Sequence, residues 1–166
     1  MKKIIILTLF SLLLITGCQN KLDLINTDAV YGKWVESSSD MMFEFDKNNT
    51  YKWYRSSTLT TDDYYYGAVK IYYNDNAIKK LTEIGGNPDF REDYETKGFK
   101  DHYAFFVIFE LNEQGVVSST TLKPGDYKKK TTPNYLIMVM EKDEKRMYGL
   151  NVETGSTYNL ILKEDN

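Results

Sequence analysis

The sequence predicts a mainly β protein: about nine antiparallel strands, curled into a barrel or a strongly bent sheet, with one short helical insert. Three observations favour this fold. Short runs alternate between apolar and polar residues and are separated by turn residues. One stretch with a helical period divides these runs into two groups. Nine strands are too many to lie comfortably in one open twisted sheet, so curling is expected.

The first group of strands contains the clearest hairpin. Met41–Asp46 alternates apolar and polar residues, Asp46–Asn49 supplies residues that tolerate turn dihedrals, and Thr50–Arg55 runs back. A longer strand is predicted over Tyr64–Tyr73, where Gly67 indicates a bulge or a bend.

The helical insert follows this strand. Asn74 or Asp75 can cap a helix whose apolar residues keep a helical period over residues 77–84, and Gly85 follows its end. A second helical turn is predicted over Pro88–Gly98, because proline is favoured at the first position of a helix.

The second group begins with Tyr103–Leu111, which is apolar on both faces and therefore predicts a central strand. Asn112–Gly115 is expected to turn the chain, so that Val116–Leu122 runs back. The remaining predicted strands are Tyr135–Glu141, Met147–Val152 and Thr157–Lys163.

The N-terminus has the pattern of an export signal. Lys2 and Lys3 precede an apolar run, Ile4–Leu14, of about a dozen residues, which is shorter than the roughly 20 needed to span a bilayer. Ile15-Thr16-Gly17-Cys18 resembles the bacterial lipobox, in which the cysteine receives the lipid. We therefore expect a signal peptide over residues 1–17, cleavage after Gly17, and a diacylglycerol and palmitate anchor on Cys18.

These features predict a lipoprotein on the extracytoplasmic face of the cell membrane, with a lipidated tether over residues 18–30 and one β domain over residues 31–166. The domain has no second cysteine, so it contains no disulfide and must be held by its apolar core. About 150 residues suffice for a single core.

Two segments carry a family resemblance. Gly32-Lys33-Trp34, followed by the hairpin Phe43–Tyr51, resembles the start of lipocalin-like domains in bacterial lipoproteins, where a G-x-W motif begins the barrel. Tyr65–Ile78, Tyr103–Glu110 and Asn151–Gly155 are similar to exported proteins of this kind from Gram-positive bacteria. The resemblance implies a lipocalin-like β-barrel and transfers no functional residue.

The sequence contains no recognisable catalytic or cofactor-binding motif. The net charge is −3, and no basic stripe indicates nucleic acid binding. His102 is the only histidine, so neither a histidine-rich metal site nor an imidazole relay is predicted. We expect no enzyme activity, no metal and no cofactor.

Aromatic residues make up 14 % of the chain and are its one compositional excess. Their ordinary interpretation is core and cross-strand packing, because β-strands favour tyrosine. The alternative is a binding surface, because a tyrosine ring combines an apolar face with a polar tip.

Three functional hypotheses remain open, all for a monomer. The first is a non-catalytic module that binds a small apolar or amphipathic ligand or a peptide, lined by Trp34, Trp53 and Tyr65, and it requires a cavity of roughly 300 Å³. The second is a protein-interaction, immunity or inhibitor lipoprotein, which requires an exposed apolar patch. The third is binding of cell-wall carbohydrate through exposed tyrosines.

Overall fold

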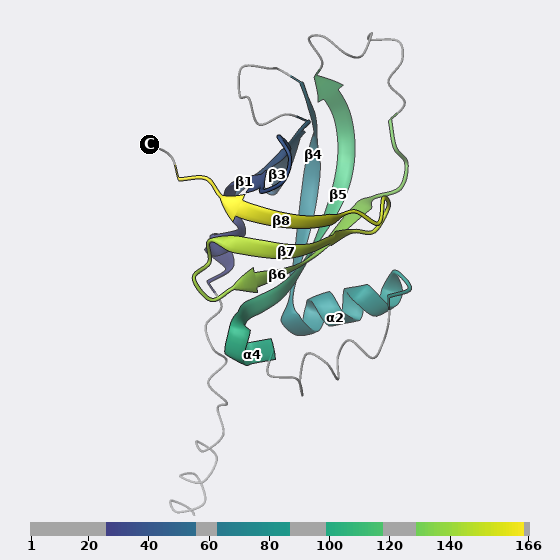
Figure 1. The fold of residues 1–166 in the computed structure, drawn as a ribbon. Coiled ribbons are helices and arrows are strands. Elements are labelled where there is room, and N and C mark those ends of the chain that lie inside the picture. Colours follow the sequence, from purple (N-terminus) through teal and green to yellow (C-terminus); the bar gives the residue numbers. More distant parts are fainter. Residues whose placement is uncertain (1–25, 56–62, 87–98, 118–128, 165–166) are drawn as a thin grey trace, which may run out of the picture.

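The computed structural model describes residues 26–55, 63–86, 99–117 and 129–164, and its eight strands close into one antiparallel barrel (Figure 1). Each strand pairs with its neighbour in the chain, and β1 closes the barrel by pairing with β8. The predicted mainly β fold is confirmed, and the barrel is the closed form of the two that the sequence left open.

The first four strands are β1 (Gly32–Glu36), β2 (Met42–Asp46), β3 (Thr50–Tyr54) and β4 (Tyr64–Tyr73). The predicted β2–β3 hairpin is confirmed, and its turn places Asn49 at a φ of 61°, a conformation that asparagine tolerates better than most residues.

The next strand is longer than the sequence predicts. β5 runs without interruption over Tyr103–Val117, so the turn predicted at Asn112–Gly115 is wrong, and the barrel has eight strands where about nine were expected. These residues stay in the sheet because they pair with the first half of β4, with a bulge beside Tyr66 and Gly67. A Cβ on Gly67 would lie 2.1 Å from the Asn112 carbonyl oxygen, so glycine is required at this bend.

The last three strands are β6 (Asn134–Glu141), β7 (Arg146–Asn151) and β8 (Thr157–Leu162), as the sequence predicts to within a few residues. Val35 of β1 lies opposite Ile161 of β8 where the barrel closes.

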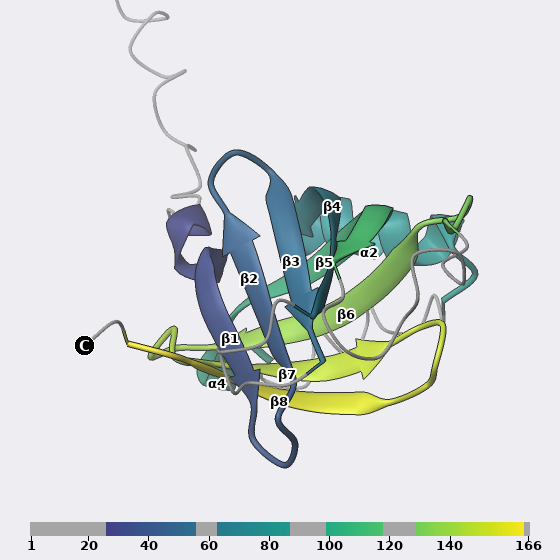
Figure 2. The same cartoon turned by 90° about the horizontal axis from the view of Figure 1, so that it is seen from above.

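Three helical segments accompany the barrel: η1 (Thr27–Val30), α2 (Asn74–Glu83) and α4 (Phe99–His102). The predicted helix after β4 is confirmed as α2, which lies across the outside of the barrel (Figures 1 and 2). Tyr73 occupies the cap position of α2 and makes no side-chain cap hydrogen bond. Asn74, the first residue of the helix, accepts a hydrogen bond on its Oδ1 from the backbone N–H of Phe106 at 3.0 Å, which ties the helix start to β5.

The folded unit begins inside the segment predicted as a tether, because Thr27–Val30 forms η1 and Val30 is fully buried. Gly17, Cys18 and the helical turn predicted over Pro88–Gly98 lie outside the described residues. Among the described residues, no helix has both the length and the apolar character needed to cross a bilayer.

Candidate functional site

The barrel interior is filled with side chains. β5 contributes one apolar row to the inside through Phe105, Val107 and Phe109, and the facing strands complete the core with aromatic rings and methionines. The largest side chains in this interior are fully buried: Trp34, Phe43, Phe45, Phe105, Phe109, Leu111, Leu136, Met138 and Met140. The described part of the chain therefore leaves no ligand-sized space among these interior residues.

Trp34, the first predicted lining residue, belongs to this packed interior. It is fully buried, and its indole N–H donates a 2.9 Å hydrogen bond to the carbonyl oxygen of Val30. Because Val30 ends η1, this bond fastens the segment before β1 onto the barrel. We call the end of the barrel that carries η1 the closed end.

Trp53 and Tyr65, the other two predicted lining residues, lie opposite each other on β3 and β4, toward the other end of the barrel. Their rings are 5.5 Å apart, and Trp53 also stacks on Phe43 at 5.5 Å. The guanidinium of Arg55 lies 4.6 Å from the Tyr65 ring. The structure thus brings Trp53 and Tyr65 together, and Phe43 lies between Trp53 and Trp34 in the same cross-strand row. Whether any of the three predicted lining residues contacts a ligand stays a prediction.

A small hollow lies beside Trp53 at this end, which we call the mouth hollow. Its volume is about 10 Å³, and it is lined by Tyr51, Trp53, Leu111, Glu113, Lys130, Thr132 and Asn134. Such a volume accommodates about one water molecule. Two buried polar atoms of this lining, Trp53 Nε1 and Asn134 Oδ1, have no hydrogen-bond partner within the described ranges.

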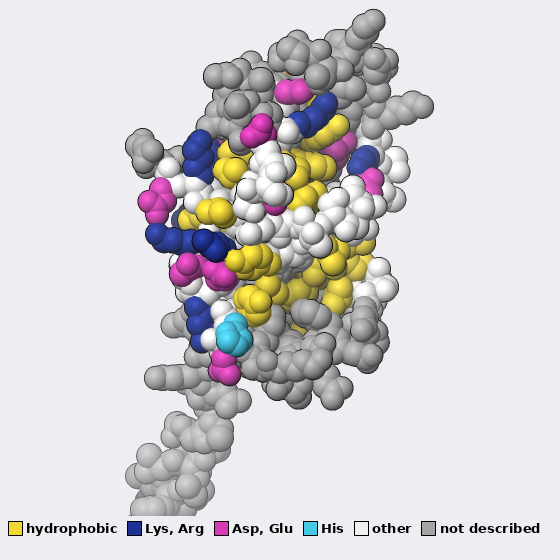
Figure 3. Space-filling model, viewed as in Figure 1, with side chains coloured by type: hydrophobic (Ala, Val, Ile, Leu, Met, Phe, Trp, Pro, Cys, Tyr) yellow, Lys and Arg dark blue, Asp and Glu magenta, His cyan; other side chains and the backbone are white. Residues whose placement is uncertain are grey.

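One part of the outer surface is apolar and uncovered. Neighbouring strands place apolar side chains opposite one another on the outside: Ile137 faces Leu150, and Val139 faces Tyr148. Leu150 and Ile161 are each 38 % exposed. We define the outer patch by its apolar side chains: Val35, Ile137, Val139, Tyr148, Leu150 and Ile161. On β7 and β8 the polar residues Arg146, Thr157 and Asn159 lie among them. On this side of the molecule hydrophobic side chains gather around the middle, and many charged ones lie toward the margin (Figure 3).

The neighbouring outer surface is covered by α2. Ala77, Ile78 and Leu81 pack against Phe106 and Ile108 of β5, which explains why β5 is apolar on both faces as predicted. Ile137 and Val139 of the outer patch also contact this cluster, so the patch continues directly from the surface beneath the helix.

A buried carboxylate fixes α2 in place. Glu110, on the outside of β5, is 5 % exposed and accepts contacts from Lys80 Nζ at 3.0 Å, Lys70 Nζ at 3.2 Å and the Tyr72 hydroxyl at 3.0 Å. Burial by itself raises the pKa of Glu110, but the hydrogen bonds from Lys80, Lys70, Asn112 and Tyr72 outweigh it and lower the pKa to about 2. Every oxygen of this carboxylate is engaged, so the cluster is structural.

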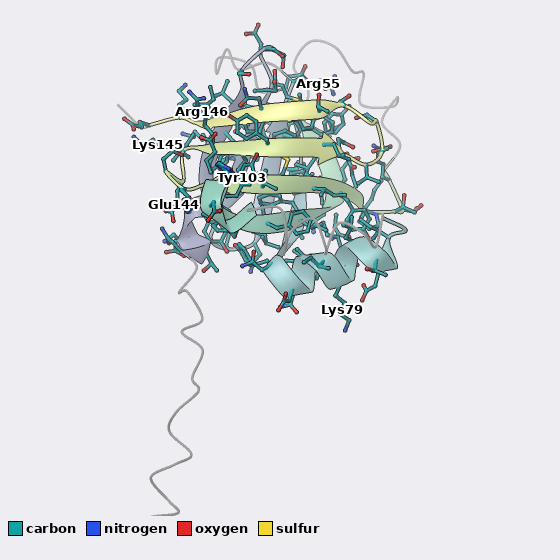
Figure 4. The ribbon with its side chains drawn as sticks, turned by 60° about the horizontal axis from the view of Figure 1, so that its bottom comes forward. Arg55, Lys79, Tyr103, Glu144, Lys145 and Arg146 are labelled. Carbon is teal, nitrogen blue, oxygen red and sulfur yellow. The ribbon has the colours of Figure 1, made fainter. Side chains whose placement is uncertain are left out.

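No catalytic constellation is present among the described residues. His102 is exposed at the end of α4, and its ring lies 6.5 Å from the Tyr103 ring. Within the described ranges, no group of three or more His, Cys, Asp and Glu side chains could hold a metal ion. Glu144, Lys145 and Arg146 sit at one end of the β6–β7 hairpin, Arg55 lies toward the other end, and Lys79 points away from the barrel (Figure 4).

Of the residues that line the mouth hollow, the sequence analysis singled out Trp53 but not Asn134. It did not single out the residues of the outer patch either. Asn134 follows Pro133 and has the appearance of a loop residue, and only the closed barrel shows that it points inward. The outer patch was detectable in part, since Leu150 and Ile161 occupy the positions that should face solvent in their strands.

No family model matches the chain, and neither the curated proteins nor the solved structures contain a match.

Proposed function

We propose that this chain is a non-catalytic lipoprotein, held by a lipid on Cys18 at the extracytoplasmic face of the cell membrane, that binds a partner protein through the outer patch. The observation that carries the proposal is the distribution of apolar side chains. The inside of the barrel is filled, whereas Leu150 and Ile161 remain 38 % exposed on the outside. Apolar side chains that stay partly exposed on several neighbouring strands are typical of an interaction site.

The filled interior favours this function over storage of a small apolar ligand. A ligand pocket needs roughly 300 Å³ or more, and the mouth hollow holds about 10 Å³. The described residues form larger hollows, of about 330 to 490 Å³, but these are open to the surface and do not enclose a ligand. The lipocalin-like resemblance at Gly32-Lys33-Trp34 therefore supports the barrel fold better than it supports an internal ligand site.

The chemistry of the outer patch suits an amphipathic helix of the partner. α2 already shows how a helix binds this barrel, with Ala77, Ile78 and Leu81 on one helical face. Ile137 and Val139 form the border between the surface under α2 and the uncovered patch. A second helix, lying beside α2 on β6, β7 and β8, would cover Leu150 and Ile161 in the same way.

The lipid anchor is tested by replacing its attachment residue. Cys18→Ala is expected to remain uncleaved and unlipidated, and mass spectrometry would show the mass of the signal peptide retained and the diacylglycerol and acyl masses absent. The control is Ser11→Ala, a small change inside the apolar run, which should be processed like the wild type. Recovery of Cys18→Ala with the same mass as the wild-type membrane form would contradict the anchor.

The partner surface is tested by site-specific photocrosslinking in intact cells. A photoreactive phenylalanine analogue at Leu150 should crosslink to one protein band, and the same analogue at the outward-pointing Lys79 of α2 should not. Adding Ile161→Glu to the Leu150 probe should remove the band, because a carboxylate would be buried in the apolar contact. Equal crosslinking from both positions, or adducts with lipid alone, would refute the proposed surface.

A further inference from the structure

The mouth hollow contains a donor and an acceptor that lack partners. Trp53 Nε1 can only donate a hydrogen bond and Asn134 Oδ1 can only accept one, and both atoms are buried without a partner among the described residues. Asn134 is 9 % exposed. Leaving such a buried polar atom unpaired is unfavourable, so the pair indicates that a further polar group belongs there.

The indole N–H of the other tryptophan, in contrast, has a partner. Trp34 Nε1 is equally enclosed, but it donates to the Val30 carbonyl oxygen at 2.9 Å. The unpaired indole N–H is therefore confined to the end of the barrel that carries the mouth hollow.

The pairing restricts the chemistry of a bound group. The group must accept from Trp53 Nε1 and donate to Asn134 Oδ1 at the same time, which a hydroxyl can do. A carboxylate or a phosphate diester has no proton to donate, and an ammonium has no lone pair to accept. The nearby cation is already neutralised, because Lys130 Nζ lies 2.6 Å from Glu153 Oε2.

The aromatic surroundings add an apolar wall. The Trp53 ring, which lines the hollow, stacks on Phe43 and is tilted against Tyr65, so two neighbouring rings hold it in place. A rigid aromatic wall next to the neutral Trp53 N–H and Asn134 amide suits the alternating C–H and O–H groups of a sugar. Glu113, which also lines the hollow, disfavours an anionic ligand.

We propose that the mouth hollow binds one hydroxyl group of a neutral sugar, which accepts from Trp53 Nε1 and donates to Asn134 Oδ1. The hollow admits one such group, and the rest of the ligand lies outside it. This site is separate from the outer patch and does not depend on the proposed protein partner.

The two indole N–H groups provide a test with an internal control. The full mature chain, in detergent micelles and labelled with ¹⁵N, should give one indole NMR signal for each of its two tryptophans. Titration with N-acetylglucosamine should shift the Trp53 signal saturably, in the millimolar range, and leave the Trp34 signal unchanged. Sodium acetate, which cannot donate a hydrogen bond, should shift neither signal.

Asn134→Leu, which has a similar shape but no acceptor, should weaken sugar binding at least tenfold. Asn159→Leu is the matched control, because Asn159 Oδ1 is also buried without a partner in the described chain but does not line the mouth hollow, and it should bind like the wild type. If Asn134→Leu fails to fold, Trp53→Phe tests the same pair. Because this variant lacks the Trp53 indole signal, its sugar binding is measured by saturation-transfer NMR on the sugar protons, and it should also be at least tenfold weaker than that of the wild type.

Three results would overturn the proposal. The absence of a saturable shift would mean that the hollow holds water only. Equal shifts of both indole signals would indicate a general effect on the barrel. Unchanged binding by Asn134→Leu would show that the sugar lies elsewhere. None of these results bears on crosslinking through Leu150, so the two proposals fail separately.

Discussion

Trp34 and Trp53 both face into the barrel, yet their surroundings differ. Trp34 is fully buried, and its N–H is bonded to Val30 at the closed end. Trp53 is half-buried beside the mouth hollow, and its N–H has no partner in the described chain. The comparison teaches that one end of the barrel is optimised for stability, whereas the other retains unsatisfied hydrogen-bonding capacity.

The outer surface shows a similar division. Beneath α2, apolar residues are covered and the carboxylate of Glu110 is bonded to Lys70, Lys80 and Tyr72. On the adjoining strands, Leu150 and Ile161 are exposed. Regions whose groups are satisfied should lose stability on mutation, and regions with unsatisfied groups or exposed apolar surface should tolerate it.

The largest effect is expected at the closed end. Trp34→Phe should lower the free energy of unfolding by about 3 kcal/mol, because it leaves a cavity and deprives the Val30 carbonyl of its donor. Trp53→Phe, the matched substitution at the other end, should change it by less than about 1 kcal/mol, because it removes a donor that has no partner. Urea unfolding compares the two, and equal losses would break the comparison.

The next effect is expected beneath α2. Glu110→Gln should lower the free energy of unfolding by about 2 kcal/mol, because the half-buried ammonium of Lys80 loses its anion. The pKa of Glu110 is lowered from 4.5 to about 2, so its charged form stabilises the fold above pH 4.5. This contribution is lost as the pH falls from 4.5 toward 2.

Unfolding measured across this pH window should therefore show a steeper loss of stability in the wild type than in Glu110→Gln. Glu144→Gln is a suitable control, since Glu144 lies in the β6–β7 turn. Within the described chain its side chain accepts one hydrogen bond, from Asn26. Parallel pH profiles for wild type and Glu110→Gln would show that Glu110 is not held ionised by its neighbours.

A smaller effect, of either sign, is expected in the mouth hollow. Asn134→Leu replaces an acceptor that has no protein partner by an apolar group of similar shape, so the free energy of unfolding should change by less than about 1 kcal/mol. Differential scanning calorimetry with and without N-acetylglucosamine measures both stability and binding. A loss comparable to that of Trp34→Phe would mean that Asn134 supports the fold.

The smallest effect is expected on the outer patch. Leu150→Ser removes an exposed side chain and should alter the free energy of unfolding by about 0.5 kcal/mol or less. Its effect on partner binding should appear as weaker crosslinking from a photoreactive probe at Ile161, on the adjacent strand β8. A large loss of stability would show that Leu150 belongs to the core and not to a binding surface.

Several elements follow directly from the residue pattern. The β2–β3 hairpin is recognisable because Phe43 and Phe45 alternate with polar residues and the turn residues follow at once. α2 is recognisable because Ala77, Ile78 and Leu81 keep a helical period. These signals are local, and the structure realises them as predicted.

The predicted turn at Asn112–Gly115 shows where local signals mislead. Asparagine and glycine favour turns in isolation, but here they pair with β4 and form a bulge beside Gly67. The bulge bends the long strand β5, which a closed barrel of this size requires. The same residue types favour a turn and a bulge, so only the pairing of this segment with β4 distinguishes the two.

The sequence by itself determined the β2–β3 hairpin, α2 and the last three strands, because each depends on the pattern of neighbouring residues. The same local pattern predicts the lipid anchor at Cys18. Tertiary structure decided that the sheet closes between β1 and β8, that Trp34 is bonded while Trp53 is not, and that Asn134 faces inward. These features depend on residues far apart in sequence, and the register of a closed barrel is what brings them together.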